Sequence, residues 1–311
     1  MLRVFVLCLG LVLPTPVFGL GGKDCVAVLK RGVGQKMIDG FLNGVLEKKA
    51  GDNWLDQSAT RITVKDGWCS YTNLELGQGS GRAKIADIRL RSPNLKEFAD
   101  TGSLPAQLDF ILSDFVMAPE FHDNPWQSYS VQAYARRFPI DLSGQLHLDA
   151  TGSRFQLEDV TADFAGNNEI TISLDASIVD DSKAWIFFPP IRTHSVSIRL
   201  QTNGLFEVLL GLYLRSGNSR DDVVAIVDAQ IIAIELWMAG LSPDQMDENS
   251  QRALSKFIAD FPNPTGQLNL SVEFPQGLAP IQAAGILYGG DFGTVKFKKL
   301  VVSYDRMPFD P

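Results

Sequence analysis

The side chains best suited to proton transfer or metal binding are few and scattered in this sequence. Its three histidines, His122, His147 and His194, lie far apart, and His147 falls on the polar side of an alternating stretch. Gly-x-Ser-x-Gly, His-Glu-x-x-His and Ser-x-x-Lys motifs, which position the nucleophile or the metal of common hydrolases, are absent. The sequence therefore predicts no catalytic residues, no cofactor and no metal site.

Two acidic pairs and one glycine-rich stretch resemble parts of binding motifs. Asp180-Asp181 and Asp221-Asp222 are adjacent carboxylates, but neighbouring residues on a strand point to opposite faces. Gly77–Gly81 lacks the Gly-Lys-Ser/Thr of a phosphate-binding loop, and Arg82 replaces the last glycine of a dinucleotide fingerprint. We expect helix capping and turns at the acidic pairs and a flexible turn at the glycines.

The first residues have the pattern of an export signal. Arg3 precedes the apolar run Val4–Leu13, prolines follow, and Val17 and Gly19 are the small residues of a signal-peptidase site. This pattern predicts a signal peptide over residues 1–19 and a mature periplasmic protein without a transmembrane anchor. An uncleaved N-terminal anchor is the alternative.

Two cysteines, Cys25 and Cys69, remain in the expected mature chain. An even number of cysteines in an exported protein indicates a disulfide, and their spacing fits no zinc or redox motif. We therefore predict a Cys25–Cys69 disulfide, with two unpaired thiols as the alternative.

Composition limits the partners that the protein can have. The chain of 311 residues is 45% hydrophobic and 21% charged, which excludes a disordered protein. Its formal net charge of −8 and the absence of a basic stripe with aromatic residues argue against nucleic acid. The acidic balance also argues against electrostatic docking on anionic membranes.

Alternating apolar and polar residues predict long antiparallel strands. The clearest run, Ile140–Ala150, is followed by Phe155–Phe164 and Ile170–Ile178, each with one apolar and one polar face. In the second run Glu158-Asp159 shifts the alternation by one residue, which is typical of a β-bulge. Similar shifts at Ala83–Leu90, Ile191–Leu200 and Val295–Tyr304 suggest a duplicated strand pair, and chance likeness of amphipathic strands is the alternative.

Further elements follow from local patterns. Asp66-Gly67 predicts a hairpin turn, and Ser219 with the following acidic residues predicts a capped helix. A membrane-surface role for the first of the helices is an alternative to its packing on the sheet. The expected helices are 34–49, 94–101, 205–214, 223–238, 242–261 and 278–287, and the expected remaining strands are 62–76, 106–112, 129–135 and 268–274.

Together these elements predict an α+β fold, with a mainly antiparallel, curved sheet of repeated bulged strand pairs and helices covering one face. The mature chain, residues 20–311, is expected to form one elongated domain, with two related halves of about 20–137 and 138–311 as a possibility.

Apolar residues are in surplus around the expected helices. We predict an apolar groove for an acyl chain or another apolar partner, and an ordinary core is the alternative explanation. The candidate groove residues are Trp185, Phe188, Phe206, Leu210 and Trp237.

Two segments resemble a family of Gram-negative periplasmic proteins, and their pattern of strands is similar to that of the β-rich AsmA-like envelope proteins. They are the strand His194–Leu205 and the stretch Ser250–Asn269, in which a helix, a proline turn and a Leu-x-Leu-x-Val strand follow each other. The resemblance implies a fold associated with lipid handling and carries over no catalytic residue.

We therefore expect a non-catalytic envelope protein that binds or shields an apolar ligand, such as lipid. A structural or protein-interaction module of the envelope is the alternative, and a hydrolase with an unrecognised site is a third hypothesis. A helical groove favours the first, an exposed apolar patch the second, and clustered carboxylates with histidine the third.

Overall fold

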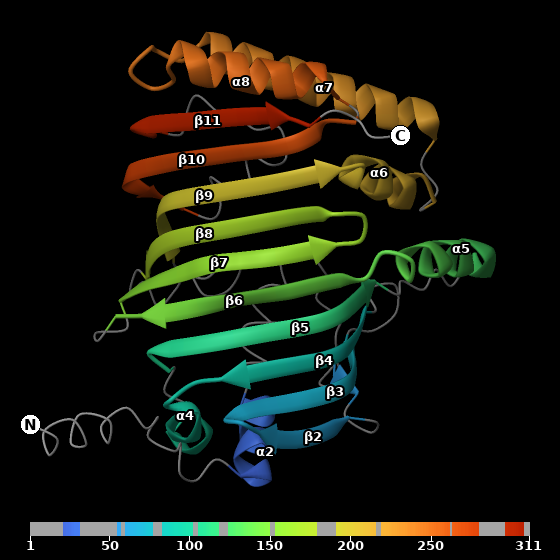
Figure 1. The fold of residues 1–311 in the computed structure, drawn as a ribbon, viewed down its shortest axis with the longest axis vertical. Helices are drawn as coiled ribbons and strands as arrows, with labels where there is room; N and C mark the ends of the chain where they lie inside the picture. Colours follow the sequence, from blue (N-terminus) through green and yellow to red (C-terminus); the bar gives the residue numbers. More distant parts are fainter. Residues whose placement is uncertain are drawn as a thin grey trace, which may run out of the picture.

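One open antiparallel sheet organises the protein (Figure 1). The computed structural model describes residues 21–31, 55–56, 60–76, 83–101, 105–117, 124–149, 153–178, 191–215, 219–261, 263–279 and 296–307. The fold is a β-rich α+β fold, as the sequence predicts.

Chain order and spatial order agree across the sheet. From β3 to β11 every strand pairs with its neighbour in the sequence, while β1 and β2 both pair with β3. The strands are β1 (Leu55–Asp56), β2 (Arg61–Lys65), β3 (Trp68–Leu76), β4 (Ala83–Arg91), β5 (Gln107–Met117), β6 (Ile140–Leu148), β7 (Arg154–Phe164), β8 (Asn168–Ile178), β9 (Ile191–Asn203), β10 (Thr265–Leu278) and β11 (Lys299–Arg306).

The described helices gather toward the two ends of the sheet and along one side of it (Figure 1). α2 and α4 lie near β2 and β3, whereas α7 and α8 lie beyond β11, and α5 and α6 project past the strand ends. The helices are α2 (Gly22–Arg31), α4 (Leu95–Thr101), α5 (Pro125–Ala135), α6 (Leu205–Arg215), α7 (Arg220–Ala239) and α8 (Glu248–Ala259).

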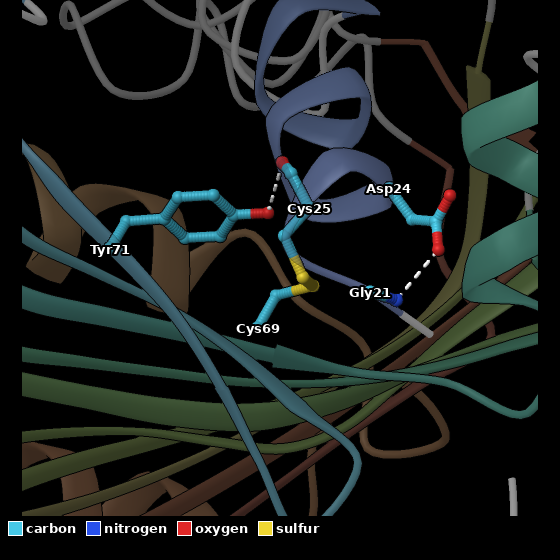
Figure 2. Close-up of a disulfide and its surroundings, with 5 residues drawn as sticks. All are labelled: Gly21, Asp24, Cys25, Cys69 and Tyr71. Carbon is cyan, nitrogen blue, oxygen red and sulfur yellow. Dashed lines mark hydrogen bonds between the residues drawn. A yellow bond between two sulfur atoms is a disulfide. The ribbon is translucent and has the colours of Figure 1, made fainter. Parts of the chain in front are cut away.

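The end of the sheet formed by β2–β5 is fastened by a disulfide. Cys25 on α2 is bonded to Cys69 on β3, with 5.6 Å between their Cα atoms, which confirms the predicted pairing (Figure 2). The Tyr71 hydroxyl donates a hydrogen bond of 2.9 Å to the Cys25 carbonyl oxygen, and all three residues are fully buried. The helix is therefore tied to the sheet covalently and through a buried hydroxyl.

At the other end, α8 and the turn before it cover the edge strand β11. The Val302 N–H donates to Ser250 Oγ at 3.1 Å, and the Leu300 N–H donates to the Gln245 carbonyl oxygen at 2.8 Å. The Tyr304 hydroxyl lies 2.9 Å from Asp260 Oδ2. An uncovered edge strand is a template for pairing with other chains, and the bonds to the Leu300 and Val302 N–H groups occupy part of that edge.

Two of the four predicted slips are bulges in the structure, and β5 carries a third bulge that was not predicted. The slip predicted at Ala83–Leu90 is wrong, because β4 keeps one register with β3 and with β5, and β11 keeps one register with β10 from Lys299 to Arg306. The register shifts at Asp114 on β5, at Asp159 on β7 and near His194 on β9, where the expected slips of Phe155–Phe164 and Ile191–Leu200 lie. Asp114 and Asp159 have positive φ angles, and their N–H groups donate to Asp141 Oδ1 and Ser173 Oγ of the next strand. A polar side chain of the following strand thus satisfies each extra backbone donor.

Several predicted elements are confirmed by the structure. The Asp66-Gly67 turn joins β2 to β3, with both residues at positive φ, and the helix predicted at 94–101 is α4. Ser219 caps α7 reciprocally with Asp222, as its position before two carboxylates suggests.

Two predictions of secondary structure are wrong. Residues 129–135, expected as a strand, belong to α5: Asn124 accepts from the Gln127 N–H as N-cap, Pro125 occupies the first turn, and Val131 is buried one turn before Ala135. Four alternating apolar residues are compatible with the two-residue period of a strand and with the period of about 3.6 residues of a helix. The capping signal decides between the two.

The second error concerns where a helix begins. α8 starts after Asp247, whose side chain accepts from the Ser250 N–H, and not at Ser242, which forms a separate turn closed by Gln245. The helix expected at 278–287 is contradicted only at Leu278, which ends β10. The signal segment, the helix at 34–49 and the rest of 278–287 lie outside the described residues, and the two-halves division stays a prediction.

Candidate functional site

An unbroken apolar row crosses the whole sheet. Register pairing places one apolar residue from each of ten consecutive strands side by side on the same face, because directly paired residues point the same way. The row is Ile62, Tyr71, Ile88, Leu112, Leu142, Ala162, Ile170, Leu200, Leu268 and Tyr304.

Burial changes along this row. Near one end Tyr71 is fully buried, although Ile62, Ile88 and Leu112 beside it are half-buried. At the other end Leu200, Leu268 and Tyr304 are 8%, 8% and 6% exposed. Between them Leu142, Ala162 and Ile170 are only half-buried. The same residue types are therefore buried on β9–β11 and, with the exception of Tyr71, only half-buried on β2–β8.

The two cores are separate clusters. The N-terminal core joins α2 and α4 to β3, β4 and β5, and the C-terminal core joins α6, α7 and α8 to β9, β10 and β11. Neither cluster includes a group of apolar side chains on β6, β7 and β8, which we call the central apolar strip. It consists of Leu142, Leu148, Phe155, Leu157, Val160, Ala162, Ile172 and Leu174.

Within the central apolar strip, Ile172 is 36% exposed and Leu142, Leu157, Val160 and Leu174 are half-buried. Full burial of such a side chain is worth about 1.5–3 kcal/mol relative to exposure. Half-exposed residues gain only part of this free energy in the isolated chain. The remainder is obtainable by binding something apolar.

Gly144 of β6 shapes the N-terminal border of the strip. A Cβ at this position would lie 2.8 Å from Val160 Cγ2 and 3.0 Å from Phe110 Cζ. Only a residue without a side chain allows these two apolar groups to approach each other across β6. The glycine therefore joins the edge of the N-terminal core to the strip.

The predicted groove residues are partly accounted for by packing. The Phe206 ring lies 4.7 Å from that of Phe261, and the Trp237 ring lies 5.9 Å from that of Phe297. Both residues pack on the C-terminal core, and Leu210 is half-buried on α6. Trp185 and Phe188 lie outside the described residues, so the groove as originally defined stays a prediction.

The opposite, polar face carries a shallow hollow of about 250 Å³ over β7–β11. Its lining combines hydroxyl, amide and charged side chains with three aliphatic residues. The residues are Asp159, Thr171, Ser173, Ser197, Ile198, Arg199, Asn269, Leu270, Ser271, Val301 and Ser303.

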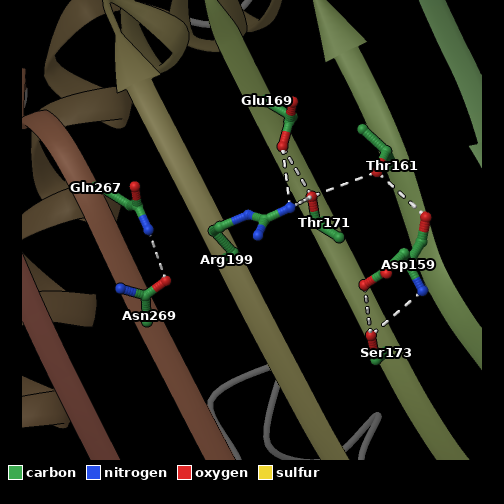
Figure 3. A network of polar contacts seen from close by, with 8 residues as sticks. All are labelled: Asp159, Thr161, Glu169, Thr171, Ser173, Arg199, Gln267 and Asn269. Carbon is green, nitrogen blue, oxygen red and sulfur yellow. Dashed lines mark hydrogen bonds and ion pairs between the residues drawn. The ribbon is translucent and has the colours of Figure 1, made fainter.

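Most polar groups of this hollow already bind one another (Figure 3). Arg199 donates to Thr171 Oγ1 at 3.2 Å and lies 3.6 Å from Glu169, while Ser173 and Asp159 form a second pair. Thr171 is only 4% exposed beneath this network. The arrangement stabilises neighbouring strands, and few of its donors are left for a ligand.

The histidines do not form a shared site in the part of the chain that the structure describes. His147 Nε2 lies 3.5 Å from Glu158 Oε2, and His194 Nε2 is 2.8 Å from Ser177 Oγ on another strand. His122 lies outside the described residues. No group of three or more metal-ligating side chains is found within the described ranges.

The shifted pKa values among the described groups have structural causes. Burial raises the pKa of Tyr304 to about 12 and raises that of Tyr71 further. A hydrogen bond from Arg154 lowers the pKa of Asp175, and bonds from the N-cap residue of α7 lower that of Asp222. Each group moves away from neutrality, so these shifts do not favour acid–base chemistry at physiological pH.

Of the acidic pairs and the glycine-rich stretch singled out in the sequence, the structure describes one pair. Asp221-Asp222 caps a helix, as expected, whereas Asp180-Asp181 and Gly77–Gly81 lie outside the described residues. Among the described helices none is long and apolar enough to cross a membrane. The absence of catalytic activity stays a prediction.

No family model, curated protein or solved structure matches this chain. The resemblance to AsmA-like envelope proteins therefore remains an expectation from the sequence pattern. The central apolar strip is incompletely buried, whereas the polar groups on the opposite face form hydrogen bonds with one another. This contrast is the strongest basis for a functional proposal.

Proposed function

We propose that the protein is a non-catalytic, exported envelope protein that binds an apolar ligand, such as the acyl chains of a lipid, on the central apolar strip. The observation that carries this proposal is the central apolar strip, whose side chains belong to neither core and are not fully buried, with Ile172 36% exposed. Bulges on alternating strands favour a curved sheet, which increases contact with a narrow ligand.

The dimensions of the strip suit an acyl chain. Neighbouring strands lie about 4.8 Å apart, so the distance from β5 to β9 is roughly 19 Å. One leaflet of a bilayer holds its acyl chains in about 15 Å, half of the ~30 Å hydrocarbon core. A chain of this length lying across the strands would therefore cover β6–β8, which are roughly 10 Å across, and most of the distance between the two cores.

The Cys25–Cys69 disulfide is compatible with export, since disulfides persist in oxidising compartments such as the periplasm. Periplasmic location itself rests on the sequence of residues 1–19. Fractionation of cells that produce the full chain tests it, and a mature protein retained in the cytoplasm contradicts it.

Adjacent residues on β6 offer a matched test of ligand binding. Leu142 lies on the apolar face and is half-buried, whereas Ser143 lies on the polar face and is exposed. Delipidated protein is titrated with a fluorescent fatty acid, for wild type, Leu142→Gln and Ser143→Gln. We expect Leu142→Gln to weaken binding about tenfold and Ser143→Gln to leave it unchanged.

Thermal unfolding of all three proteins shows whether the substitutions preserve the fold. A wild-type protein that takes up no fatty acid, or two variants with equal affinity, would refute binding on the central apolar strip.

A protein-interaction module is the second candidate, and α7 supplies a specific observation for it. Val224, Ile232 and Leu236 are spaced along one side of this helix and are 48%, 56% and 70% exposed. Exposed apolar stripes mark interaction sites. If the protein is an interaction module, Leu236→Ser abolishes its binding to a partner protein or to a second copy of the chain. The wild type then binds no fatty acid.

A further inference from the structure

The helix α5 exposes two aromatic side chains on one side. Trp126 is 82% exposed and Tyr129 is 64% exposed, and residues three apart share a helix face. Val131 and Ala135, on the opposite side, are buried. The helix is thus anchored by one face and presents an indole and a phenol on the other.

The charge of α5 and of the turn that follows it is opposite to that of the whole chain. From Asn124 to Ile140 the sequence contains no acidic residue, and the exposed Arg136 and Arg137 follow the helix directly. On the neighbouring helix, Arg215 stacks over the Tyr134 ring at 4.0 Å, which adds a third guanidinium. The local balance is basic, although the formal net charge of the protein is −8.

Two carboxylates near these arginines are engaged, while Glu120 and Asp123, which precede α5 in the chain, lie outside the described residues. Asp141, the next acidic residue along the chain, lies on the polar face of β6 and accepts the Asp114 N–H. Glu207 on α6 accepts a hydrogen bond from Asn263 at 2.7 Å. Within the described residues, Arg136 and Arg137 form no ion pair.

We propose that α5 docks the protein on a bilayer with anionic head groups. Trp126 and Tyr129 enter the interface, where amphipathic aromatic rings are favoured, and Arg136, Arg137 and Arg215 lie beside the phosphates. The negative net charge of the protein does not prevent this docking. Salt screens charges that lie more than about 8 Å from the membrane surface at physiological ionic strength, so the residues at α5 determine the local interaction.

The position of α5 connects this docking to the proposed function, on which this part of the inference rests. The helix projects beyond the strand ends and leads into β6 within five residues, with the Phe138 ring 4.9 Å from that of Tyr134 (Figure 1). Ile140, the first apolar residue of β6, therefore follows the membrane-facing helix closely. A lipid leaving the bilayer at α5 would meet the border of the central apolar strip.

The exposed stripe of α7 provides the matched control. It is flanked by Asp221, Asp228 and Glu235, so an anionic surface repels it although it is comparably apolar. The purified mature protein is floated with vesicles of phosphatidylcholine and of phosphatidylcholine mixed with phosphatidylglycerol. The variants are Trp126→Ser/Tyr129→Ser, Arg136→Gln/Arg137→Gln and Leu236→Ser.

We expect wild type and Leu236→Ser to float with the anionic vesicles and less with the neutral ones. The arginine variant should lose about thirtyfold in vesicle affinity, since each cation near the surface contributes about fivefold, and the aromatic variant about tenfold. If the wild type does not bind anionic vesicles, the proposal is overturned. This result is expected if α5 binds only proteins. Equal loss in Leu236→Ser also overturns it.

Fatty-acid binding without vesicles separates this inference from the proposed function. Both α5 variants should keep it, which also shows that they fold. Vesicle binding by a wild type that takes up no fatty acid would leave docking intact and remove the apolar-ligand function.

Discussion

The ends and the centre of the sheet use the same strand pattern with different results. At the ends, helices cover the apolar face, and Leu74 and Leu300 are 1% and 3% exposed. On β6–β8 equivalent residues remain half-buried, and Ile172 is 36% exposed. Alternation therefore determines which face is apolar, but it does not determine what covers that face.

The two ends also differ from each other. The N-terminal core is closed by a covalent bond and a buried tyrosine, whereas the C-terminal core is closed by aromatic packing and by hydrogen bonds to an edge strand. Substitutions at the ends should thus lower stability, and substitutions in the centre should alter binding more than stability.

Removing the disulfide should have the largest effect on stability. The bond joins residues 44 apart, and the chain-entropy model gives about 4 kcal/mol for a loop of this size. We expect Cys25→Ser/Cys69→Ser to lose about this much free energy of unfolding in urea. An unchanged midpoint would mean that the N-terminal core is stable without its covalent link.

Truncation of buried and half-exposed side chains compares an end with the centre directly. Leu74→Ala should cost about 3 kcal/mol, because it creates a cavity in the N-terminal core. Ile172→Ala, at a site that is already 36% exposed, should cost about 1 kcal/mol or less. Urea unfolding of both variants measures the difference, and equal losses would show that the centre is as closed as the ends.

Loss of the edge bond at β11 should have a moderate effect. Ser250 is 2% exposed, and its hydroxyl accepts the Val302 N–H. Ser250→Ala leaves this buried donor without its partner and should cost about 1–2 kcal/mol. Hydrogen exchange at Val302 should accelerate, while that of the β7 and β8 amides should not change.

The smallest effect is expected from alkaline titration of the C-terminal core. Tyr304 has its pKa raised to about 12 by burial, and the unfolded chain ionises near pH 10. The contribution of Tyr304 to the free energy of unfolding is complete below pH 10. It declines as the pH rises toward 12, because the tyrosine of the unfolded state loses its proton first. Tyr304→Phe should flatten this decline.

The pKa of Tyr71 is raised in the same direction, so part of the alkaline loss should persist in Tyr304→Phe. Urea midpoints measured between pH 8 and 11 check this, at the same ionic strength throughout. A variant with the same pH dependence as wild type would show that Tyr304 does not contribute.

The sequence predicted those features that depend on local chemistry. The alternation of β6–β8, the bulge at Glu158-Asp159, the Asp66-Gly67 turn and the Ser219 cap all follow from residues close together in the chain. The disulfide was predictable because only two cysteines follow the predicted signal peptide.

Features that depend on distant residues were not predicted. α2 begins with Gly22 directly after Gly21, and its burial of Cys25 and Val28 depends on β3. α5 was mistaken for a strand because its alternation suits both periods. The open state of the central apolar strip depends on where the helices of other segments pack, which local patterns do not specify.

The agreement between chain order and strand order has a consequence for synthesis. In a meander each strand needs only its predecessor as a partner, so the sequence separation of contacts along β3–β9 stays short. Such contacts close small loops, and they form quickly as a chain emerges from its N-terminus. The sheet can therefore grow strand by strand, with its final edge covered only when β11 meets α8.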